Sequence, residues 1–440
     1  MKKLVAGAAV AALLGSAAFA DVSVGAWGRA VTGIGNATNG DSDGTDVQIS
    51  NMQSWGDNGP RNGITFEGDH DGVIGFNAEA FLNGTSGWSV GDNAHVWYQP
   101  IEQLRVAIGL MDYNPLRSSA IYGLWDMKRV GTEGNKEPWT FMGQSATGAV
   151  VSVFPIEGLQ FHASLNYPMQ GSKVKSYGKG YSVDPDDTTY TSNLANVMGR
   201  QSSYALAYAI GGEEPIATIK VGLQELGRVV VKKDSDGTEY KDQNIINAAV
   251  DLQPMENLFI SVGAFIPTVQ YKMSDDSSTY TANGWKTASD VDYTNSFNRI
   301  NAYLKFGAME GLNIHARVGT KLNCPDLKED DNGNIKEKDG QFGFLVGAGV
   351  DYALMDDLTL YADFGYANGI YWSCSTADNT DCLDFGIGVT KDYGEGCSVS
   401  AGFVGATNGN GMYDTTYTDD NGDTQYPFSW GIPLVITYSF

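Results

Sequence analysis

Histidine and cysteine, which supply general bases, nucleophiles and soft metal ligands in many enzymes, are scarce in this chain of 440 residues. Only four of each occur: His70, His95, His162, His315, Cys324, Cys374, Cys382 and Cys397. No H-E-x-x-H motif is present, and no cysteine pair has a histidine partner at zinc spacing. We therefore expect no enzymatic activity, no cofactor and no metal centre.

Charged residues, in contrast, are frequent and unevenly placed. Three acidic sequences, at 41–46, 330–333 and 419–423, resemble fragments of calcium-binding loops but lack the full ligand pattern of an EF-hand. Asp, Asn and Gly accept turn geometry, so we interpret these segments as turns, with loop-bound divalent cations as the alternative. Cys374 and Cys382 flank one loop and could form a disulfide in an oxidising compartment.

The first twenty residues predict a cleaved signal peptide, which leaves 21–440 as the mature chain. Lys2 and Lys3 precede a short apolar run, and Ala18-Phe19-Ala20 fits a cleavage site. That run is about half of the ~20 residues that a membrane-spanning helix needs. Removing the two lysines leaves 26 Lys and Arg against 52 Asp and Glu, a formal charge of −26. Nucleic acid binds basic surfaces, so we exclude it as a partner.

One unit recurs along the mature chain: a short turn, then a strand in which every second residue is apolar. After the turn at 309–311, for example, the apolar residues are Leu312, Ile314, Ala316 and Val318. Strict alternation predicts a strand, and turn residues on both sides predict hairpins. Eight such turns occur, at 69–72, 100–103, 155–158, 212–215, 254–257, 309–311, 355–357 and 393–396. They predict sixteen strands, and further strands near 22–31 and 426–440 raise the number to eighteen.

Long polar segments separate these hairpins, at 32–61, 113–145, 168–200, 270–296, 321–341 and 406–425. Short turns that alternate with long loops are typical of outer-membrane barrels, with the turns periplasmic and the loops extracellular. In the last strand, apolar and aromatic residues occupy alternate positions from Tyr426 to Phe440. Such a strand exposed to water would promote aggregation. Closure against the first strand in lipid removes that hazard.

With its signal peptide, hairpin-linked strands and terminal Phe440, the chain resembles the large Gram-negative outer-membrane porins over its whole mature length. The resemblance implies an all-β, transmembrane, antiparallel up-and-down barrel of about eighteen strands, or alternatively sixteen, in the cell outer membrane. It also implies that the barrel-assembly machinery recognises the C-terminal strand, including Tyr438 and Phe440. Outer-membrane lipid would surround the barrel, and the protein would form a homotrimer.

If the apolar positions face lipid, the alternate positions face the lumen. On this phase the strands carry charged and polar residues that we predict to line a pore: Arg29, Glu79, Arg105, His162, Lys220, Arg299, Tyr303, Lys305, His315, Arg317, Tyr361 and Asp363. Cations outnumber acids in this set. We therefore expect a lumen that leans basic, with the acidity of the chain placed mainly in loops and turns.

The loop at 113–145 follows the fifth expected strand. In porins the third loop folds into the barrel and narrows it, so the resemblance makes 113–145 the candidate constriction loop. Charges at a constriction influence which ions pass, and those in this loop include Arg117, Asp126, Lys128, Arg129 and Glu133. The alternative is a loop that lies on the surface.

Together these patterns predict a porin that allows small hydrophilic solutes or ions to diffuse passively through a water-filled lumen. The alternative is a surface adhesin or structural barrel without channel activity, because the polar loops are long.

Overall fold

The computed structural model describes residues 21–38, 44–51, 61–83, 87–111, 116–119, 139–141, 146–166, 202–212, 214–234, 237–267, 298–329, 335–372, 381–409 and 412–440. The predicted signal peptide at 1–20 lies outside these ranges. The described chain is almost entirely β-strand, with one short helix, α4 (Gly369–Trp372). None of its helical residues forms a helix long and apolar enough to span a bilayer.

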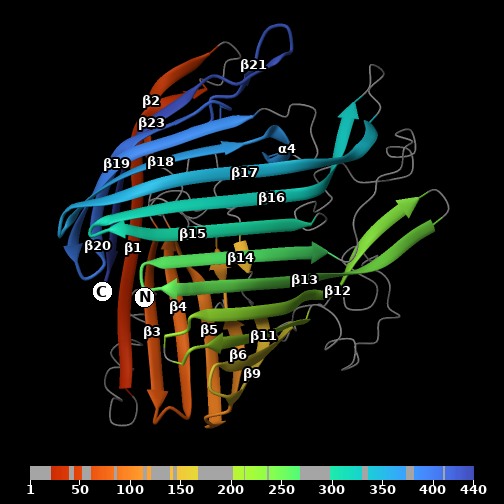
Figure 1. The fold of residues 1–440 in the computed structure, drawn as a ribbon, viewed down its shortest axis with the longest axis vertical. Coiled ribbons are helices and arrows are strands. Elements are labelled where there is room, and N and C mark those ends of the chain that lie inside the picture. Colours follow the sequence, from red (N-terminus) through yellow and green to blue (C-terminus); the bar gives the residue numbers. More distant parts are fainter. Residues whose placement is uncertain are drawn as a thin grey trace, which may run out of the picture.

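Nineteen strand segments join in one antiparallel sheet (Figure 1). In chain order they are β1 (Asp21–Thr38), β2 (Thr45–Asn51), β3 (Arg61–His70), β4 (Ile74–Asn83), β5 (Gly87–Ile101), β6 (Leu104–Met111), β9 (Ala146–Ile156), β10 (Leu159–Asn166), β11 (Ser202–Ile210), β12 (Ala217–Asp234), β13 (Gly237–Met255), β14 (Leu258–Pro267), β15 (Arg299–Met309), β16 (Leu312–Glu329), β17 (Ile335–Met355), β18 (Leu358–Ala367), β19 (Cys382–Gly394), β20 (Cys397–Ala406) and β23 (Ser429–Ser439). Two short pairs lie outside the sheet, β7 (Ser118–Ser119) with β8 (Trp139–Phe141) and β21 (Tyr417–Thr418) with β22 (Thr424–Gln425).

The sheet closes on itself through its first and last strands. Residues 27–35 of β1 pair with residues 431–439 of β23. On its other edge, residues 32–38 of β1 pair with β2 and residues 21–29 pair with β3. β2 and β3 are therefore two parts of one interrupted strand. The barrel therefore has eighteen strands, each hydrogen-bonded to its neighbours in sequence. This confirms the predicted up-and-down barrel and the higher of the two expected strand numbers.

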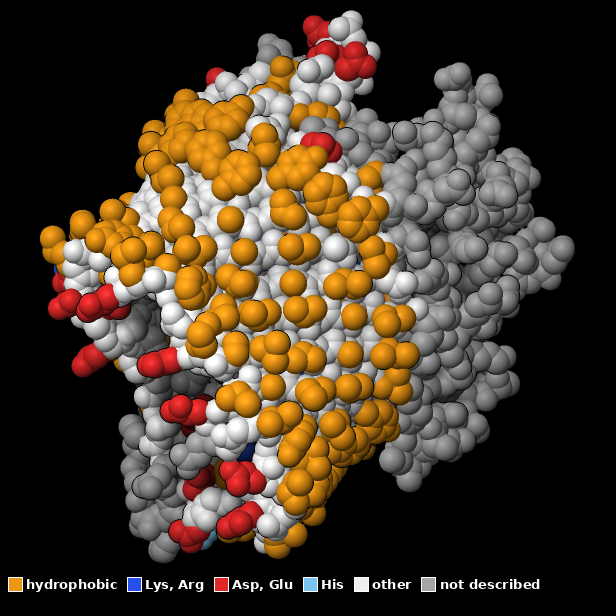
Figure 2. Space-filling model, viewed as in Figure 1, with side chains coloured by type: hydrophobic (Ala, Val, Ile, Leu, Met, Phe, Trp, Pro, Cys, Tyr) orange, Lys and Arg blue, Asp and Glu red, His pale blue; other side chains and the backbone are white. Residues whose placement is uncertain are grey.

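Alternation along each strand separates an apolar outer surface from the interior. On β23, Ile432, Leu434 and Ile436 are 48, 39 and 46% exposed, whereas Val435 between them is 1% exposed. Figure 2 shows regularly spaced apolar side chains over the face formed by β12 to β20, with acidic groups gathered mainly along its left and lower-left margin. A closed barrel satisfies its backbone groups between strands, which is what allows such a surface to contact lipid.

All eight predicted short turns connect paired strands, and they lie at one end of the barrel, called here the turn end. The C-terminus lies there too, since the backbone of Phe440 exchanges hydrogen bonds with that of Ala26 at 2.8 and 3.2 Å. Tight turns place residues in left-handed conformations, such as Gly311 with φ 75°. The opposite end, called the loop end, carries all of the long connections, and two short ones between β4 and β5 and between β12 and β13.

Candidate functional site

The twelve residues predicted to line a pore all occupy alternate strand positions whose side chains face the barrel interior, opposite to the exposed apolar side chains. Register places Lys220, for example, across from Ala207 and Ala249, while the neighbouring Ile219 and Val221 are exposed on the outer surface. Six of the twelve are nearly inaccessible to solvent: Arg29, His162, Lys220, His315, Arg317 and Tyr361. Lys305 is exposed, and the remaining five are partly exposed: Glu79, Arg105, Arg299, Tyr303 and Asp363.

The same phase carries charged residues that the sequence interpretation did not single out. The cations are Arg61 and Lys321, and the acids are Glu67, Asp69, Asp251, Asp351 and Asp384. Each lies at an alternate strand position, so the period of two that identified the other twelve also marks these seven. With them included, cations and acids are interleaved around the barrel. Cations still outnumber acids in the combined set, by eight Lys or Arg to seven Asp or Glu, so the expected basic lean remains but is smaller than the sequence indicated.

Part of the 113–145 loop lies inside the barrel. β8 packs against β13, β14 and β15, although five strands separate β6, where this loop begins, from β14. Phe141 and Leu116 are buried in one cluster with inward-facing alanines of β11 and β13. Gly263 faces β8 so closely that a Cβ atom there would lie 1.6 Å from the carbonyl oxygen of Thr140. The described part of this loop therefore crosses the interior and docks on the wall.

A chain of polar contacts fixes this docking. The hydroxyl groups of Thr140 and Ser261 lie 2.6 Å apart, and Ser261 donates to Asp251 at 2.5 Å. Asp251 also forms an ion pair with Lys220, with 2.6 Å between Nζ and Oδ2. Of the five charged loop residues named from the sequence, Arg117 is exposed, and Asp126, Lys128, Arg129 and Glu133 lie outside the described residues.

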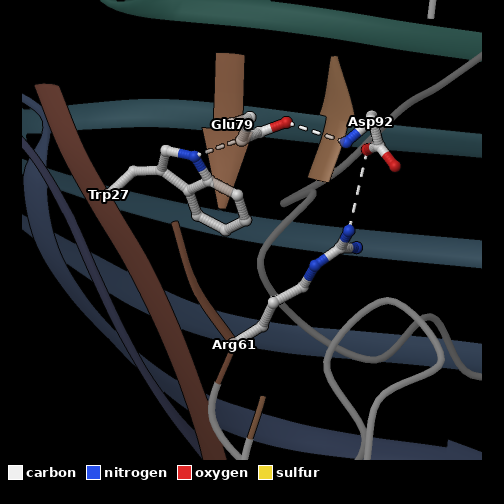
Figure 3. A network of polar contacts seen from close by, with 4 residues as sticks. All are labelled: Trp27, Arg61, Glu79 and Asp92. Carbon is white, nitrogen blue, oxygen red and sulfur yellow. Dashed lines mark hydrogen bonds and ion pairs between the residues drawn. The ribbon is translucent and has the colours of Figure 1, made fainter. Parts of the chain in front are cut away.

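A second polar network lies on the wall formed by β1, β3, β4 and β5 (Figure 3). Glu79 accepts hydrogen bonds from the indole of Trp27 at 3.0 Å and from the backbone of Asp92 at 3.1 Å. Arg61 lies 3.6 Å from the carboxylate of Asp92 and 4.0 Å above the ring of Phe81. Arg29 is directly opposite Arg61 in the β1–β3 register. Like charges at opposed positions repel, and the carboxylate of Asp92 offsets this.

β15 to β19 carry a third group of interacting charges. His315 binds Asp351 at 2.5 Å and the hydroxyl of Tyr303 at 3.0 Å. Arg317 acts electrostatically on buried Asp384 across three strand spacings. The two inward residues between them in register are Gly347 and Gly365, which have no side chains to separate the charges.

Two further segments from the loop end enter the barrel. In α4, Tyr371 is buried over β16 and β17, and its carbonyl group accepts a hydrogen bond from Lys321. Burial raises the pKa of Tyr371, against the opposing charges of Arg299 and Arg317. Between β20 and β23, Met412 is buried against β1 and β23, and the hydroxyl of Tyr413 donates to the carbonyl of Gly33 at 2.6 Å.

The remaining predicted residues lie near the seam or in loops. Tyr438 faces outward at the turn end and donates to Asn62 at 2.9 Å, while Phe440 is 73% exposed. In the acidic segment at 419–423, Asp419 accepts backbone hydrogen bonds from Asn421 and Asp423 at 2.9 and 3.0 Å, as the turn interpretation predicts. These bonds lower the pKa of Asp419, the bond from Asp423 most strongly.

Two motifs with chemical precedents have a plain structural setting. Gly87-Trp88-Ser89-Val90-Gly91 matches the G-x-S-x-G pattern, which in hydrolases forms a strand-to-helix turn. Here it lies within β5, and Ser89 is paired with Phe81 of β4. Cys382 is a buried free thiol, and its suggested partner Cys374 lies outside the described residues. Among the described residues, no three His, Cys, Asp or Glu side chains are grouped to hold a metal ion.

Comparison with known proteins gives one match to a family model, that of the OmpA-like transmembrane domain, over residues 208–395. Similar solved structures include Pseudomonas aeruginosa OccK9 (OpdG), with 9% identity, 96% of this chain and 98% of that chain covered, and a TM-score of 0.47. P. aeruginosa OpdQ is 11% identical, with 96% of this chain and 98% of that chain covered and a TM-score of 0.46. Salmonella typhi OmpF in complex with daunomycin is 11% identical, with 95% of this chain and 97% of that chain covered and a TM-score of 0.42. No curated protein sequence matches significantly.

The matched region extends from β11 to the turn between β19 and β20, and so covers nearly half of the strands of the closed barrel. The barrel has an apolar outer surface and a charged interior, as a transmembrane β-barrel requires. This architecture and the family match together identify the chain as an outer-membrane β-barrel protein.

Proposed function

We propose that this barrel is a porin through which small hydrophilic solutes and ions diffuse passively. The observation that supports the proposal best is the charged interior, in which Lys305 remains exposed and Arg105, Arg299 and Glu67 keep partial or full access to solvent. Charged groups at interior positions favour water over a packed core. An eighteen-stranded barrel is also wide enough to leave an aqueous channel.

The docked part of the 113–145 loop supports a constriction. Its buried residues occupy part of the lumen beside β11 to β15, where they leave less of the cross-section for solutes. Ions that pass this level encounter Lys305 and Arg299 of β15 on the wall. We propose that this loop segment and the neighbouring wall charges together set the size limit and the ion preference.

The same proposal includes the route of assembly. A signal peptide at 1–20 would direct export, the C-terminal strand would be recognised by the barrel-assembly machinery, and three copies would associate in the membrane. N-terminal sequencing of the membrane-extracted protein should begin at Asp21. Light scattering of the detergent-solubilised protein should give three chains per particle.

Single-channel recording tests the transport function. The purified barrel in planar bilayers should give stepwise conductance increments, with a reversal potential in a salt gradient that reports its ion preference. Neutral sugars of increasing size should reduce the conductance until they no longer enter. A correctly folded barrel that gives no steps would contradict the proposal and favour the adhesin or structural alternative.

A further inference from the structure

A hollow of about 380 Å³ lies in the lumen wall near the turn end, apart from the docked loop. Inward-facing residues of four consecutive strands, β3 to β6, form most of its lining. The six that matter for its chemistry are Glu67, Asp69, Asn77, His95, Trp97 and Arg105. Binding sites for small molecules usually have volumes of this order, with a few converging polar groups.

The two sides of the hollow carry opposite charge. On β3, Glu67 and Asp69 point inward two residues apart, and both are exposed. Each is held in place, since Asn77 donates to Glu67 at 2.8 Å and the backbone of Gly72 donates to Asp69 at 3.0 Å. These bonds leave further carboxylate lone pairs for a solute, because an ionised carboxylate offers about four acceptor sites.

On the opposite side, Arg105 of β6 lies with its guanidinium carbon 4.1 Å from the centre of the Trp97 ring. Trp97 itself packs against buried residues of β6 and β9. Its ring covers Gly75, where a Cβ atom would lie 2.5 Å from the indole. The glycine thus allows the ring to lie flat on the wall, and the ring fixes the position of Arg105. Trp97 is a positioning residue in this arrangement.

His95 lies between the two sides and interacts electrostatically with both Glu67 and Arg105. Glu67 is on β3 and Arg105 is on β6, with β4 and β5 between them. Because neighbouring strands are about 4.8 Å apart, the backbones of β3 and β6 are about 14 Å apart. The carboxylates and the guanidinium therefore face one another over a gap of small-molecule size. A single charge in this gap would be attracted by one side and repelled by the other, whereas a dipolar solute is attracted by both.

We propose that this hollow binds small zwitterionic solutes, such as amino acids and short peptides. The solute's ammonium group contacts Glu67 and Asp69, and its carboxylate contacts Arg105. The assignment rests on the proposed porin function, because a solute reaches the hollow through the lumen.

Titration by ligand-observed NMR tests the assignment on the purified, folded full-length barrel. Glycylglycine is the probe, and its matched controls are N-acetylglycine, glycinamide and glucose. Because glycylglycine makes one more charged contact than either singly charged control, it should bind at least about tenfold more tightly than both. Equal binding of N-acetylglycine or of glycinamide, or no binding of glycylglycine, would overturn the proposal. This comparison needs no variant.

Variants then locate the site. Arg105→Gln, and Glu67→Gln combined with Asp69→Asn, should each weaken glycylglycine binding by about tenfold or more. Arg61→Gln is the matched control, since Arg61 also faces inward and lies on an aromatic ring but does not line the hollow. An equal loss with Arg61→Gln would contradict the site. Conductance is recorded on the same samples: binding without steps removes only the porin proposal, and steps without binding remove only this one.

Discussion

One added methyl group, at Gly263 of β14, should disturb the docking of the 113–145 loop on the barrel wall. Gly263→Ala would place a methyl group 1.6 Å from the carbonyl oxygen of Thr140, within the backbone of β8. Backbone cannot rotate aside as a flexible side chain can, so β8 must move back by about 1.8 Å to reach an ordinary contact of 3.4 Å. The β14 strand itself accepts alanine, because Gly263 has no left-handed conformation. We therefore expect the substitution to detach the loop and to leave the barrel intact.

The size of the effect follows from what β8 loses. Phe141 is fully buried and the hydroxyl of Thr140 is bonded to Ser261. Exposure of a phenylalanine costs about 1.5–3 kcal/mol and loss of a neutral hydrogen bond about 1 kcal/mol, so docking weakens by about 2–4 kcal/mol. Since 1.4 kcal/mol corresponds to a factor of ten, the undocked population should rise by about 30- to 1,000-fold.

Alkylation of a thiol introduced by Thr140→Cys measures this population, in a background in which the native cysteines are replaced by serine. Because the cysteine has already removed the Thr140 hydrogen bond, only the Phe141 contribution remains, and the reaction rate with a water-soluble maleimide should rise by about 10- to 150-fold when Gly263→Ala is added. Current noise in the open channel should also increase. Gly386→Ala is the matched control, because its Cβ would make only ordinary contacts, at 3.5 Å with Val404 and 3.9 Å with the carbonyl oxygen of Phe403. Equal rates for the two alanine variants would refute the docking geometry.

Three further outcomes are expected. Lys305→Glu should shift the reversal potential in the direction of greater cation preference. The permeability ratio should change by up to about 30-fold, because a nearby charge in water contributes about 1 kcal/mol and this substitution reverses the charge, a change of about 2 kcal/mol. Lys391→Glu, at the turn end, should leave the reversal potential unchanged. Asn36→Ala removes side-chain bonds of 2.8 and 2.7 Å to backbone near β23, including that of Trp430, and should lower the free energy of unfolding in guanidinium by about 1–3 kcal/mol. An NMR titration should give Asp419 a pKa below 3.8, so its stabilisation of the β21–β22 hairpin is complete above that pH and is lost as pH falls through the lowered pKa; a pKa of 3.8 or above would contradict this.

The wall of the barrel was predictable from sequence because its physical cause is local. A strand between lipid and water must alternate, and the period of two that marks Leu434 and Ile436 as outward marks Val435 as inward. The interruption between β2 and β3 was not predictable in this way. Both parts continue one edge of β1, but the long polar segment 32–61 contains no pattern that indicates where pairing resumes.

The charge of the interior was predicted only in part, because alternation shows which residues face inward but not which of them form pairs. Asp251 and Lys220 are 31 positions apart in the chain and belong to adjacent strands, and their ion pair depends on the register of β12 and β13. Register is fixed by a whole hairpin, and not by the two residues that benefit from it. A list of inward cations therefore overstated the basic character of the lumen.

The loops that enter the barrel left a trace in the sequence that alternation alone does not explain, namely glycine at inward positions. Gly263 faces Thr140, Gly343 faces Tyr371, and Gly431 faces Met412. A wide barrel cannot be filled by its wall side chains, and glycine is where another backbone or side chain can approach most closely. Gly75, however, is covered by Trp97 of the neighbouring β5 strand. An inward glycine thus predicts that something covers the wall there, and only the three-dimensional structure distinguishes a docked loop from a neighbouring ring.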